Sequence, residues 1–161
     1  MIRKAKLEDA KAITDIYNEY VMNSVVTFEV EPLSEEAMRL RMERMIPKFP
    51  YFVDIQDGKI AGYCYAHPWK ERIAYRHTLE TTVYLAPGFV GRGIGRALME
   101  HLIEACRNDD YCALIACIVA GNEASNILYK KLGFKQVSHF VKVGRKFDRW
   151  LDVMDFELLL S

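Results

Sequence analysis

The chain has 161 residues, of which 51% are hydrophobic and 12% aromatic, which suits a single compact domain over residues 1–161 with a sizeable core. Lysine plus arginine and aspartate plus glutamate number 22 each, so no net field favours nucleic acid or a membrane surface as partner. The start, MIRKAKLEDA, has no apolar signal segment, and no run approaches the roughly 20 apolar residues of a membrane span. We therefore expect a cytoplasmic protein with a small-molecule partner.

The N-terminal half predicts two helices followed by the first part of a sheet. Residues 2–6 form a short strand candidate, and apolar residues at helical spacing predict a helix over about 8–22. Ser34 and the two glutamates after it predict the start of a second helix, which Pro47 ends. Strands at about 51–56 and 60–67 are joined by QDGK, a hairpin turn.

The C-terminal half alternates strands and helices. A strand at 77–86 leads through a glycine-rich turn into a helix that begins near Ile94, and a strand at 112–119 follows. Asn122 is a good N-cap for a last helix, which Gly133 ends. Strands at about 134–143 and 149–159 close the chain. The predicted fold is α/β, a mixed sheet with helices on both faces.

The four cysteines are Cys64, Cys106, Cys112 and Cys117. They form no C-x-x-C pair and have no histidine at ligand spacing, so we expect no metal site. Most lie in apolar runs such as YCALIACIV, which favours reduced cysteines in the core. A nucleophilic cysteine is the alternative, but no His or Asn context supports it.

The most informative stretch is VYLAPGFVGRGIGRAL at 83–98, in which glycines at 91, 93 and 95 open a helix. Such a turn allows backbone amides to approach a ligand closely, and the natural ligand is a pyrophosphate. The spacing fits neither a dinucleotide fingerprint nor a P-loop. It resembles the [QR]-x-x-G-x-[GA] acetyl-CoA motif of the GNAT N-acetyltransferases, with Val90 in place of the polar first residue. A helix-capping turn without a ligand is the alternative.

Acetyl transfer from a thioester to an amine needs a base for the amine, donors for the oxyanion and a proton for the thiolate. Glu80 is the candidate base because strand alternation places it on one face with Thr78, Thr82 and Tyr84. The alternative is a structural ion pair with Arg76 or His77.

Tyr129 is the candidate acid, and a core tyrosine is the alternative. Asn122, Ser125 and Asn126 crowd the first turn of the same helix. Capping explains one of these side chains, most easily that of Asn122, and leaves the others for a polar ligand such as a pantetheine arm.

An aromatic and cationic set surrounds the central strands. Arg72 and Arg76 could bind a substrate carboxylate, although arginines in such a loop are often simply solvated. The other members are Phe28, Glu29, Tyr63, Tyr65, Trp69 and Tyr75, and the alternative for the aromatic ones is a place in the core. A basic run at Lys142, Arg145, Lys146 and Arg149 predicts a solvated strand face.

Motifs along nearly the whole chain resemble the phosphinothricin N-acetyltransferase branch of the GNAT family: TFEVEP, GYCYAHPWKERIAYRHTLETTVYLAP, GRGIGRAL, NEASNILYKKLGF and VGRKFDRWLDV. The resemblance implies the GNAT fold, with a mostly antiparallel sheet, and a homodimer that acetylates small amino-acid analogues such as phosphinothricin and methionine sulfoximine. It assigns the base to Glu80. It also implies that Val83 and Leu85 pair with the pantetheine arm, that Gly91, Arg92, Gly93, Ile94, Gly95 and Arg96 hold the pyrophosphate, and that the acceptor lies near Phe28, Glu29, Arg72, Ile73, Ala74, Tyr75 and Arg76. We add Tyr84, Asn122, Ser125, Asn126 and Lys131 to the predicted acetyl-CoA contacts and Tyr63 to the predicted acceptor site.

The chain departs from this branch at three positions. Val90 replaces Gln or Arg, Tyr129 stands where many members have histidine, and Asp148 replaces a small residue in the C-terminal hairpin. Three functions remain open at this point. The first is N-acetylation of an amino-acid-like α-amine. The second is acetylation of another amine, such as a polyamine or a protein N-terminus, and the third is non-catalytic acyl-CoA binding.

Overall fold

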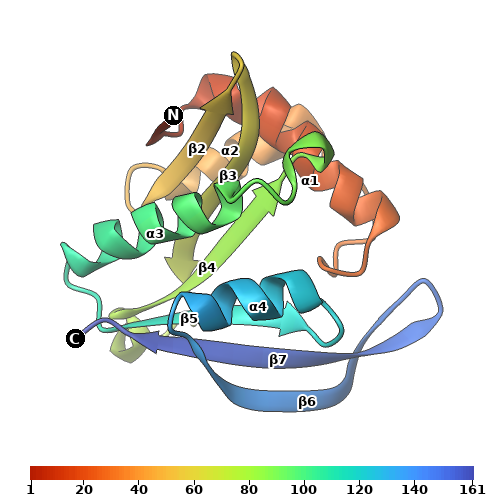
Figure 1. Cartoon of the computed structure of the whole chain (residues 1–161), viewed down its shortest axis with the longest axis vertical. Coiled ribbons are helices and arrows are strands. Elements are labelled where there is room, and N and C mark those ends of the chain that lie inside the picture. Colours follow the sequence, from red (N-terminus) through yellow and green to blue (C-terminus); the bar gives the residue numbers. More distant parts are fainter.

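A computed structural model describes residues 1–161 as one twisted sheet with two helices on each face (Figure 1). The strand order is β1-β2-β3-β4-β5-β7-β6, and only β4 and β5 run parallel. The strands are β1 (Ile2–Lys4), β2 (Tyr51–Gln56), β3 (Lys59–Pro68), β4 (Thr78–Leu85), β5 (Ala113–Val119), β6 (Lys135–Lys146) and β7 (Arg149–Leu159). The helices are α1 (Ala10–Asn23), α2 (Glu35–Met45), α3 (Ile94–Arg107) and α4 (Glu123–Lys131). The predicted mixed, mostly antiparallel α/β fold is confirmed.

The helix ends lie where local chemistry places them. The Ser34 hydroxyl accepts the amide of Ala37 at 3.1 Å, and the Asn122 side chain accepts the amide of Ser125 at 3.3 Å. Gly133 takes a φ of 95° just past α4, a conformation that favours glycine. The predicted caps are confirmed.

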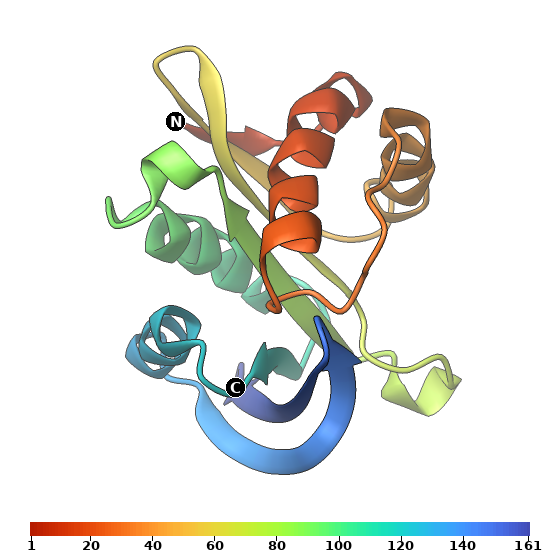
Figure 2. The same ribbon diagram turned by 90° about the vertical axis from the view of Figure 1, so that its right-hand side faces the viewer.

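Helices α1 and α2 cover one face of the sheet and α3 and α4 the other (Figure 2), and an apolar cluster fills the space under each pair. One joins α1 and α2 to the sheet through residues such as Ile13, Met42 and Val53. The other joins α3 and α4 to it through residues such as Leu98 and Phe156. Successive strand residues point to opposite faces, so each strand contributes to both clusters.

Some predicted boundaries were wrong. The first strand ends at Lys4 rather than at residue 6, and residues 7–9 form a 3₁₀ turn before α1. Asp9 directs this change, since its carboxylate accepts the Lys6 amide at 2.9 Å and both guanidinium nitrogens of Arg3 at 2.8 Å. At the other end β6 extends to Lys146, beyond the predicted residue 143.

The prediction of a solvated basic face on the C-terminal hairpin was wrong for Lys146. Its side chain is only 3% exposed, and Nζ donates to the Thr27 carbonyl at 2.9 Å. Nearby, the Phe28 ring packs directly against Gly144, where a Cβ would clash with the ring. The β6–β7 hairpin is thus fastened to the loop that follows α1.

The prediction that the cysteines are core residues holds for Cys64 and Cys106 but was wrong for Cys112 and Cys117, which are exposed. Cys112 precedes β5. Cys117 lies in mid-strand, on the sheet face opposite that of Ala116 and Ile118, which pack in the α3–α4 cluster.

The buried ammonium of Lys146 yields a stability prediction. Lys146→Met keeps the length of the side chain but leaves the Thr27 carbonyl without its donor. We expect the free energy of unfolding to fall by about 1–3 kcal/mol. Lys135→Met, at an exposed position of the same strand, should change it by less than about 0.5 kcal/mol. Urea denaturation of both variants measures the difference, and equal stabilities would contradict the buried contact.

Candidate active site

The site begins where β4 and β5 separate. The two strands pair only over Thr78–Glu80 and Ala113–Ile115. Beyond this point β4 continues along β3 and β5 continues along β7, so the two diverge (Figure 1). We call this divergence the fork.

The backbone of β4 is available on the side of the fork. The Ala86 amide bonds the Ala61 carbonyl at 2.8 Å on the β3 side. Because backbone groups alternate along a strand, those of Val83 and Leu85 point toward the fork. The Leu85 carbonyl already accepts a hydrogen bond from the Tyr20 hydroxyl at 2.5 Å. The amide and the carbonyl of Val83 both face the fork. An extended ligand can pair with β4 there as an added strand.

At the end of β4 the glycine loop turns into α3. Gly91 and Gly93 have φ values of 82° and 79°, which favour glycine strongly. Gly95 differs, because it is an ordinary helical residue packed near Leu85. Gly93 caps α3 without any side-chain acceptor, so the first amides of this helix point outward unsatisfied by a side chain. Such amides suit a phosphate group.

The arginines of the loop have local partners. The Arg92 guanidinium lies 5.1 Å from the centre of the Phe89 ring, and Arg96 Nε donates to Glu100 at 2.8 Å. Val90 is exposed, so its side chain has no part in the packing of the core. Arg96 is therefore not a free cation in this structure, and the loop's attraction for an anion depends chiefly on its amides.

Helix α4 lines the opposite side of the fork. The Oδ1 atom of Asn126 is buried and has no hydrogen-bond partner. It lies one helical turn before Tyr129 on the same side of the helix. A buried acceptor without a donor is costly, which points to a ligand N–H at this position.

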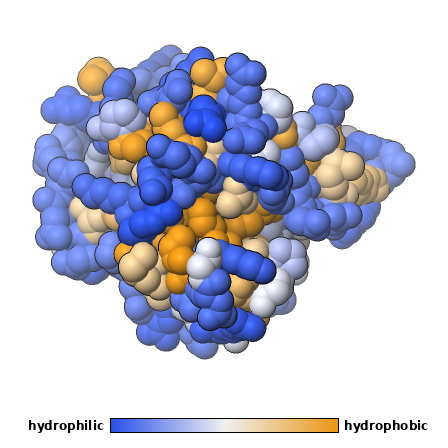
Figure 3. Space-filling view, turned by 90° about the horizontal axis from the view of Figure 1, so that it is seen from above, coloured by the Kyte–Doolittle hydropathy of each residue, from blue (hydrophilic) through white to orange (hydrophobic).

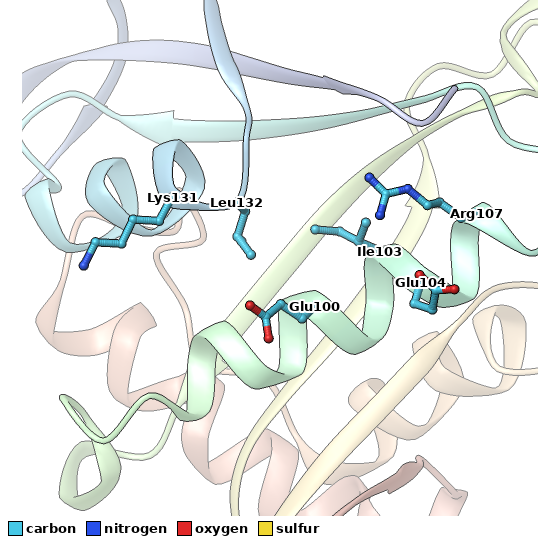
Figure 4. A pocket seen from close by; sticks show the side chains of 6 residues that line it. All are labelled: Glu100, Ile103, Glu104, Arg107, Lys131 and Leu132. Atoms are coloured by element: carbon cyan, nitrogen blue, oxygen red, sulfur yellow. The ribbon is translucent and has the colours of Figure 1, made fainter.

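Lys131 lies apart from the glycine loop. It lines a hollow of about 270 Å³ between α3 and α4, together with residues of the middle and end of α3. Figure 4 shows its side chain extending away from the α3 residues. The other lining residues are Glu100, Ile103, Glu104, Arg107 and Leu132.

Tyr129 is buried at 4% exposure within the α3–α4 cluster, where its ring meets Phe134 edge-on at 5.0 Å. Burial raises the pKa of its hydroxyl, an effect that the nearby Thr81 side chain partly opposes. The hydroxyl therefore stays protonated at neutral pH and can donate a proton or a hydrogen bond. Both interpretations, core residue and acid, remain compatible with this packing.

Glu80 projects from the opposite face of the sheet. Its side chain is 26% exposed, and Oε2 lies 3.5 Å from Nε2 of His67. The predicted alternative partners were wrong: no ion pair joins Glu80 to Arg76, and His77 contacts Asp110 instead. Glu80 and Tyr129 thus flank the start of the fork from opposite faces.

Cys117 adds a thiol to the Glu80 face. Its Sγ donates to Asp155 Oδ1 at 3.0 Å, and the other oxygen of Asp155 accepts the Ser138 hydroxyl at 2.9 Å. Although part of the Cys117 residue is exposed, partial removal of its thiol from water is the largest cause that raises the pKa of this thiol, and the carboxylates of Asp155 and Glu80 raise it further. The thiol therefore remains protonated at neutral pH, which makes it a poor nucleophile.

The loop after α1 supplies Phe28 and Glu29. The Glu29 carboxylate is held by both Arg41 nitrogens and by the Tyr17 hydroxyl at 2.7 Å. The hydrogen bonds from Arg41 are the largest cause of the lowered pKa of Glu29. This carboxylate is therefore ionised and already paired. Glu29 therefore fixes the loop that carries Phe28, and its charge is not free for a ligand.

The structure does not bring every predicted acceptor residue together. Tyr63 is 1% exposed and stacks among other tyrosines in the core, so its predicted place on the acceptor surface was wrong. Arg72 to Arg76 form an exposed loop around a 3₁₀ turn at Ile73–Tyr75, which includes Ala74. Lys70, Glu71, Arg72 and Tyr75 line an open hollow of about 520 Å³ there.

Sequence reasoning missed His67, Asp155 and Arg41, and it did not place Cys117 beside Glu80. Alternation along β3 would have placed His67 on the face of Tyr65, but its pairing with Glu80 depends on strand register. Nothing in the sequence signals the Cys117–Asp155 contact, which joins two strands 38 residues apart.

Comparison with known proteins gives the family. The model of the acetyltransferase (GNAT) domain matches residues 2–154. The chain belongs to the GNAT acetyltransferase family. Phosphinothricin N-acetyltransferase of Alcaligenes faecalis is 39% identical over 155 residues, covering 95% of this chain and 79% of that protein. L-methionine sulfoximine/L-methionine sulfone acetyltransferase of Salmonella typhimurium is 32% identical over 161 residues, covering 99% and 94%.

A solved GNAT structure supports the same assignment. The phosphinothricin acetyltransferase of Sinorhizobium meliloti, in complex with acetyl-CoA, superposes with a TM-score of 0.97 at 36% identity, covering all of this chain and 88% of that chain. The resemblance to the GNAT family and its fold, expected from the motifs, is confirmed.

The two carboxylates beside Cys117 yield a pH-dependent prediction. Because Asp155 helps to raise the pKa of the thiol, Asp155→Asn should lower that pKa and increase the thiolate fraction. We expect alkylation of Cys117 by iodoacetamide at pH 8 to become about three- to tenfold faster. Peptide mass mapping follows Cys117 separately, with Cys112 as the internal reference. An unchanged rate would contradict the contact.

Proposed function

We propose that this GNAT acetyltransferase transfers the acetyl group of acetyl-CoA to the α-amine of a small amino-acid-like substrate. The observation that carries the proposal is the fork, with Glu80 on one face of the sheet and Tyr129 on the other. The names of the similar proteins, which cite phosphinothricin, methionine sulfoximine and acetyl-CoA, support the same substrate class. No helix of the structure is long and apolar enough to cross a membrane.

The acetyl-CoA contacts follow the elements of the fork. The amides of residues 91–96 would hold the pyrophosphate, and the backbone of Val83 to Leu85 would pair with the pantetheine arm. The orphan Oδ1 of Asn126 would accept an amide N–H of that arm. Tyr84 offers the arm no group of its own, because its backbone faces β3, where it pairs with Tyr63, and its ring packs with Tyr17, Tyr20 and Tyr63 on the other face of the sheet.

In this proposal the base and the acid act from opposite faces of the sheet. Glu80 removes a proton from the acceptor ammonium, directly or through water, so that the neutral amine can attack the thioester carbonyl. Tyr129, kept protonated by burial, gives a proton to the departing thiolate. Because base and acid lie on opposite faces, the acceptor and the thiol need not compete for the same space.

The acceptor side combines the Phe28 loop, held by Glu29 and Arg41, with the cationic loop at Arg72 to Arg76. An amino acid offers a carboxylate as well as an amine, and a guanidinium binds a carboxylate through two parallel hydrogen bonds. Arg72 lines the hollow described above and is the better placed of the two arginines.

We further propose a cytoplasmic homodimer. The β6–β7 hairpin protrudes from the body, at the right of Figure 3, and carries several exposed apolar side chains among polar ones. Exposed apolar side chains on one protrusion favour burial against a second copy. Its members are Val137, Phe140, Val141, Val143, Phe147 and Trp150. The four free cysteines suit a reducing compartment.

A thiol-release screen tests the proposed reaction. Acetyl-CoA is incubated with the protein and with phosphinothricin, methionine sulfoximine, the common amino acids, polyamines or a peptide N-terminus. Amino-acid-like compounds should give the highest kcat/KM. A clear preference for polyamines or peptides would overturn the substrate class, and no thiol release with any amine would overturn the enzymatic function.

The glycine loop yields a cofactor prediction. Gly93→Val places a β-branched side chain at a φ of 79°, which displaces the loop and its amides. We expect the KM for acetyl-CoA to rise at least tenfold. Gly58→Val is the matched control, since Gly58 has a φ of 75° in the β2–β3 turn. It should cost similar stability and leave this KM unchanged. Unchanged CoA affinity in folded Gly93→Val protein would remove the loop from the site.

The base yields the sharpest prediction. Glu80→Gln keeps the shape of the side chain but removes its basic group, so kcat should fall by roughly 10²- to 10⁴-fold while CoA affinity stays the same. Glu157→Gln, on β7, is the control and should keep the wild-type rate. If Glu80 serves only as a partner of His67, the variant will lose thermal stability and retain its rate and its pH profile.

A further inference from the structure

His67 is the histidine closest to the proposed base, and the mechanism above gives it no role. It lies directly opposite Glu80 in the antiparallel pairing of β3 and β4. Its Nε2 is 3.5 Å from Glu80 Oε2, and its Nδ1 is 3.0 Å from the carbonyl oxygen of Pro68. Both side chains are partly open to solvent, at 31% for His67 and 26% for Glu80.

The contact with Pro68 fixes the form of the ring. A carbonyl oxygen only accepts hydrogen bonds, so Nδ1 must carry a hydrogen in this contact. In the neutral ring the lone pair is then on Nε2, the nitrogen that faces Glu80. An ionised carboxylate offers only lone pairs as well. The two groups can therefore attract each other only when they hold one proton between them.

Among the protein groups around the pair, His67 is the one in contact with Glu80 that can accept that proton. On β3 the Tyr65 ring lies 5.8 Å from the His67 ring, and its buried hydroxyl has a raised pKa. On β5 the Cys117 thiol is kept protonated, and on β7 both oxygens of Asp155 accept hydrogen bonds. Tyr129 of α4 is a protonated donor, and the Arg41 guanidinium of α2 is paired with Glu29.

We propose that His67 is the proton relay of the acceptor site: it receives at Nε2 the proton that Glu80 takes from the acceptor ammonium, and it releases that proton to water. The inference rests on the proposed function and extends it to a residue outside the expected site. His67 acts through Glu80, so it is a positioning and relay residue rather than one that touches the acceptor.

The proton balance is complete without any further reactant. Glu80 first breaks an N–H bond of the ammonium and becomes a carboxylic acid. The acid then transfers this proton to Nε2, which regenerates the carboxylate and leaves an imidazolium with hydrogens on both nitrogens. Water takes the Nε2 proton. The overall reaction of an ammonium with a thioester to give an amide and a thiol releases one proton, which is the one carried by this route. The second N–H proton, lost as the amide forms, replaces through water the proton that Tyr129 gives to the thiolate.

The test uses His67→Asn, in which an amide N–H can still donate to Pro68 but no group titrates. We expect kcat to fall about tenfold, with the KM for acetyl-CoA and for the acceptor unchanged. Added imidazole should restore the rate in proportion to its concentration, because it replaces the missing proton acceptor. His101→Asn is the control: His101 is exposed on α3, against Phe52, and the variant should behave as wild type.

Two outcomes would overturn the relay. A wild-type kcat in His67→Asn would do so, and so would a lowered kcat that imidazole does not restore, which indicates a structural role. Nitrogen-15 spectra of the wild-type ring give a readout independent of activity. A neutral ring protonated on Nε2 would contradict the proposal, because that nitrogen could not then accept a proton.

The kinetic comparison of wild type, His67→Asn and His101→Asn uses whichever amine gives the highest turnover in the thiol-release screen. A failure of the amino-acid assignment would therefore leave the test of His67 intact, on a polyamine or a peptide. If no amine is acetylated, there is no ammonium proton for His67 to relay, and this result overturns the relay proposal together with the proposed function.

Discussion

The parallel pairing of β4 with β5, and its early end, is the constraint on which the site depends. Three residue pairs join the strands and then stop at Glu80 and Ile115. Had the pairing continued, the backbone of Val83 would be satisfied by β5 and could not pair with a ligand. Because it stops, the sheet keeps its continuity through the paired residues and still offers an open strand edge beside a helix N-terminus.

The same constraint sets the roles of the two proposed catalytic groups. Alternation along β4 turns Glu80 toward the α1–α2 face, and its neighbour Thr81 faces Tyr129 on the other. Glu80 lies partly open to solvent beside His67, whereas Tyr129 is buried among apolar groups that keep its hydroxyl protonated. The proposed base and acid would therefore work in different environments at one position of the sheet.

Much of the fold and of the candidate site could be predicted from the sequence, because these features depend on residues that are close together in the chain. The glycine spacing, the Asn122 cap and the side of β4 that carries Glu80 all depend on residues a few positions apart. The interactions that the sequence could not give depend on register or on distant contacts. His67 meets Glu80 only through the β3–β4 register, Glu29 is held by Arg41 of another helix, and Lys146 reaches Thr27 across 119 residues. Tyr63 and Tyr65 look alike in sequence, yet the former lies wholly in the core.

A crystal structure of the protein with CoA tests the central claim most directly. The account predicts that the pantetheine arm lies in the fork, hydrogen-bonded to the backbone of Val83. The sulfur should lie within about 3.5 Å of the Tyr129 hydroxyl, on the side of the sheet away from Glu80. CoA bound elsewhere, or a sulfur on the Glu80 face with Tyr129 still enclosed in its apolar cluster, would contradict the division of base and acid between the two faces.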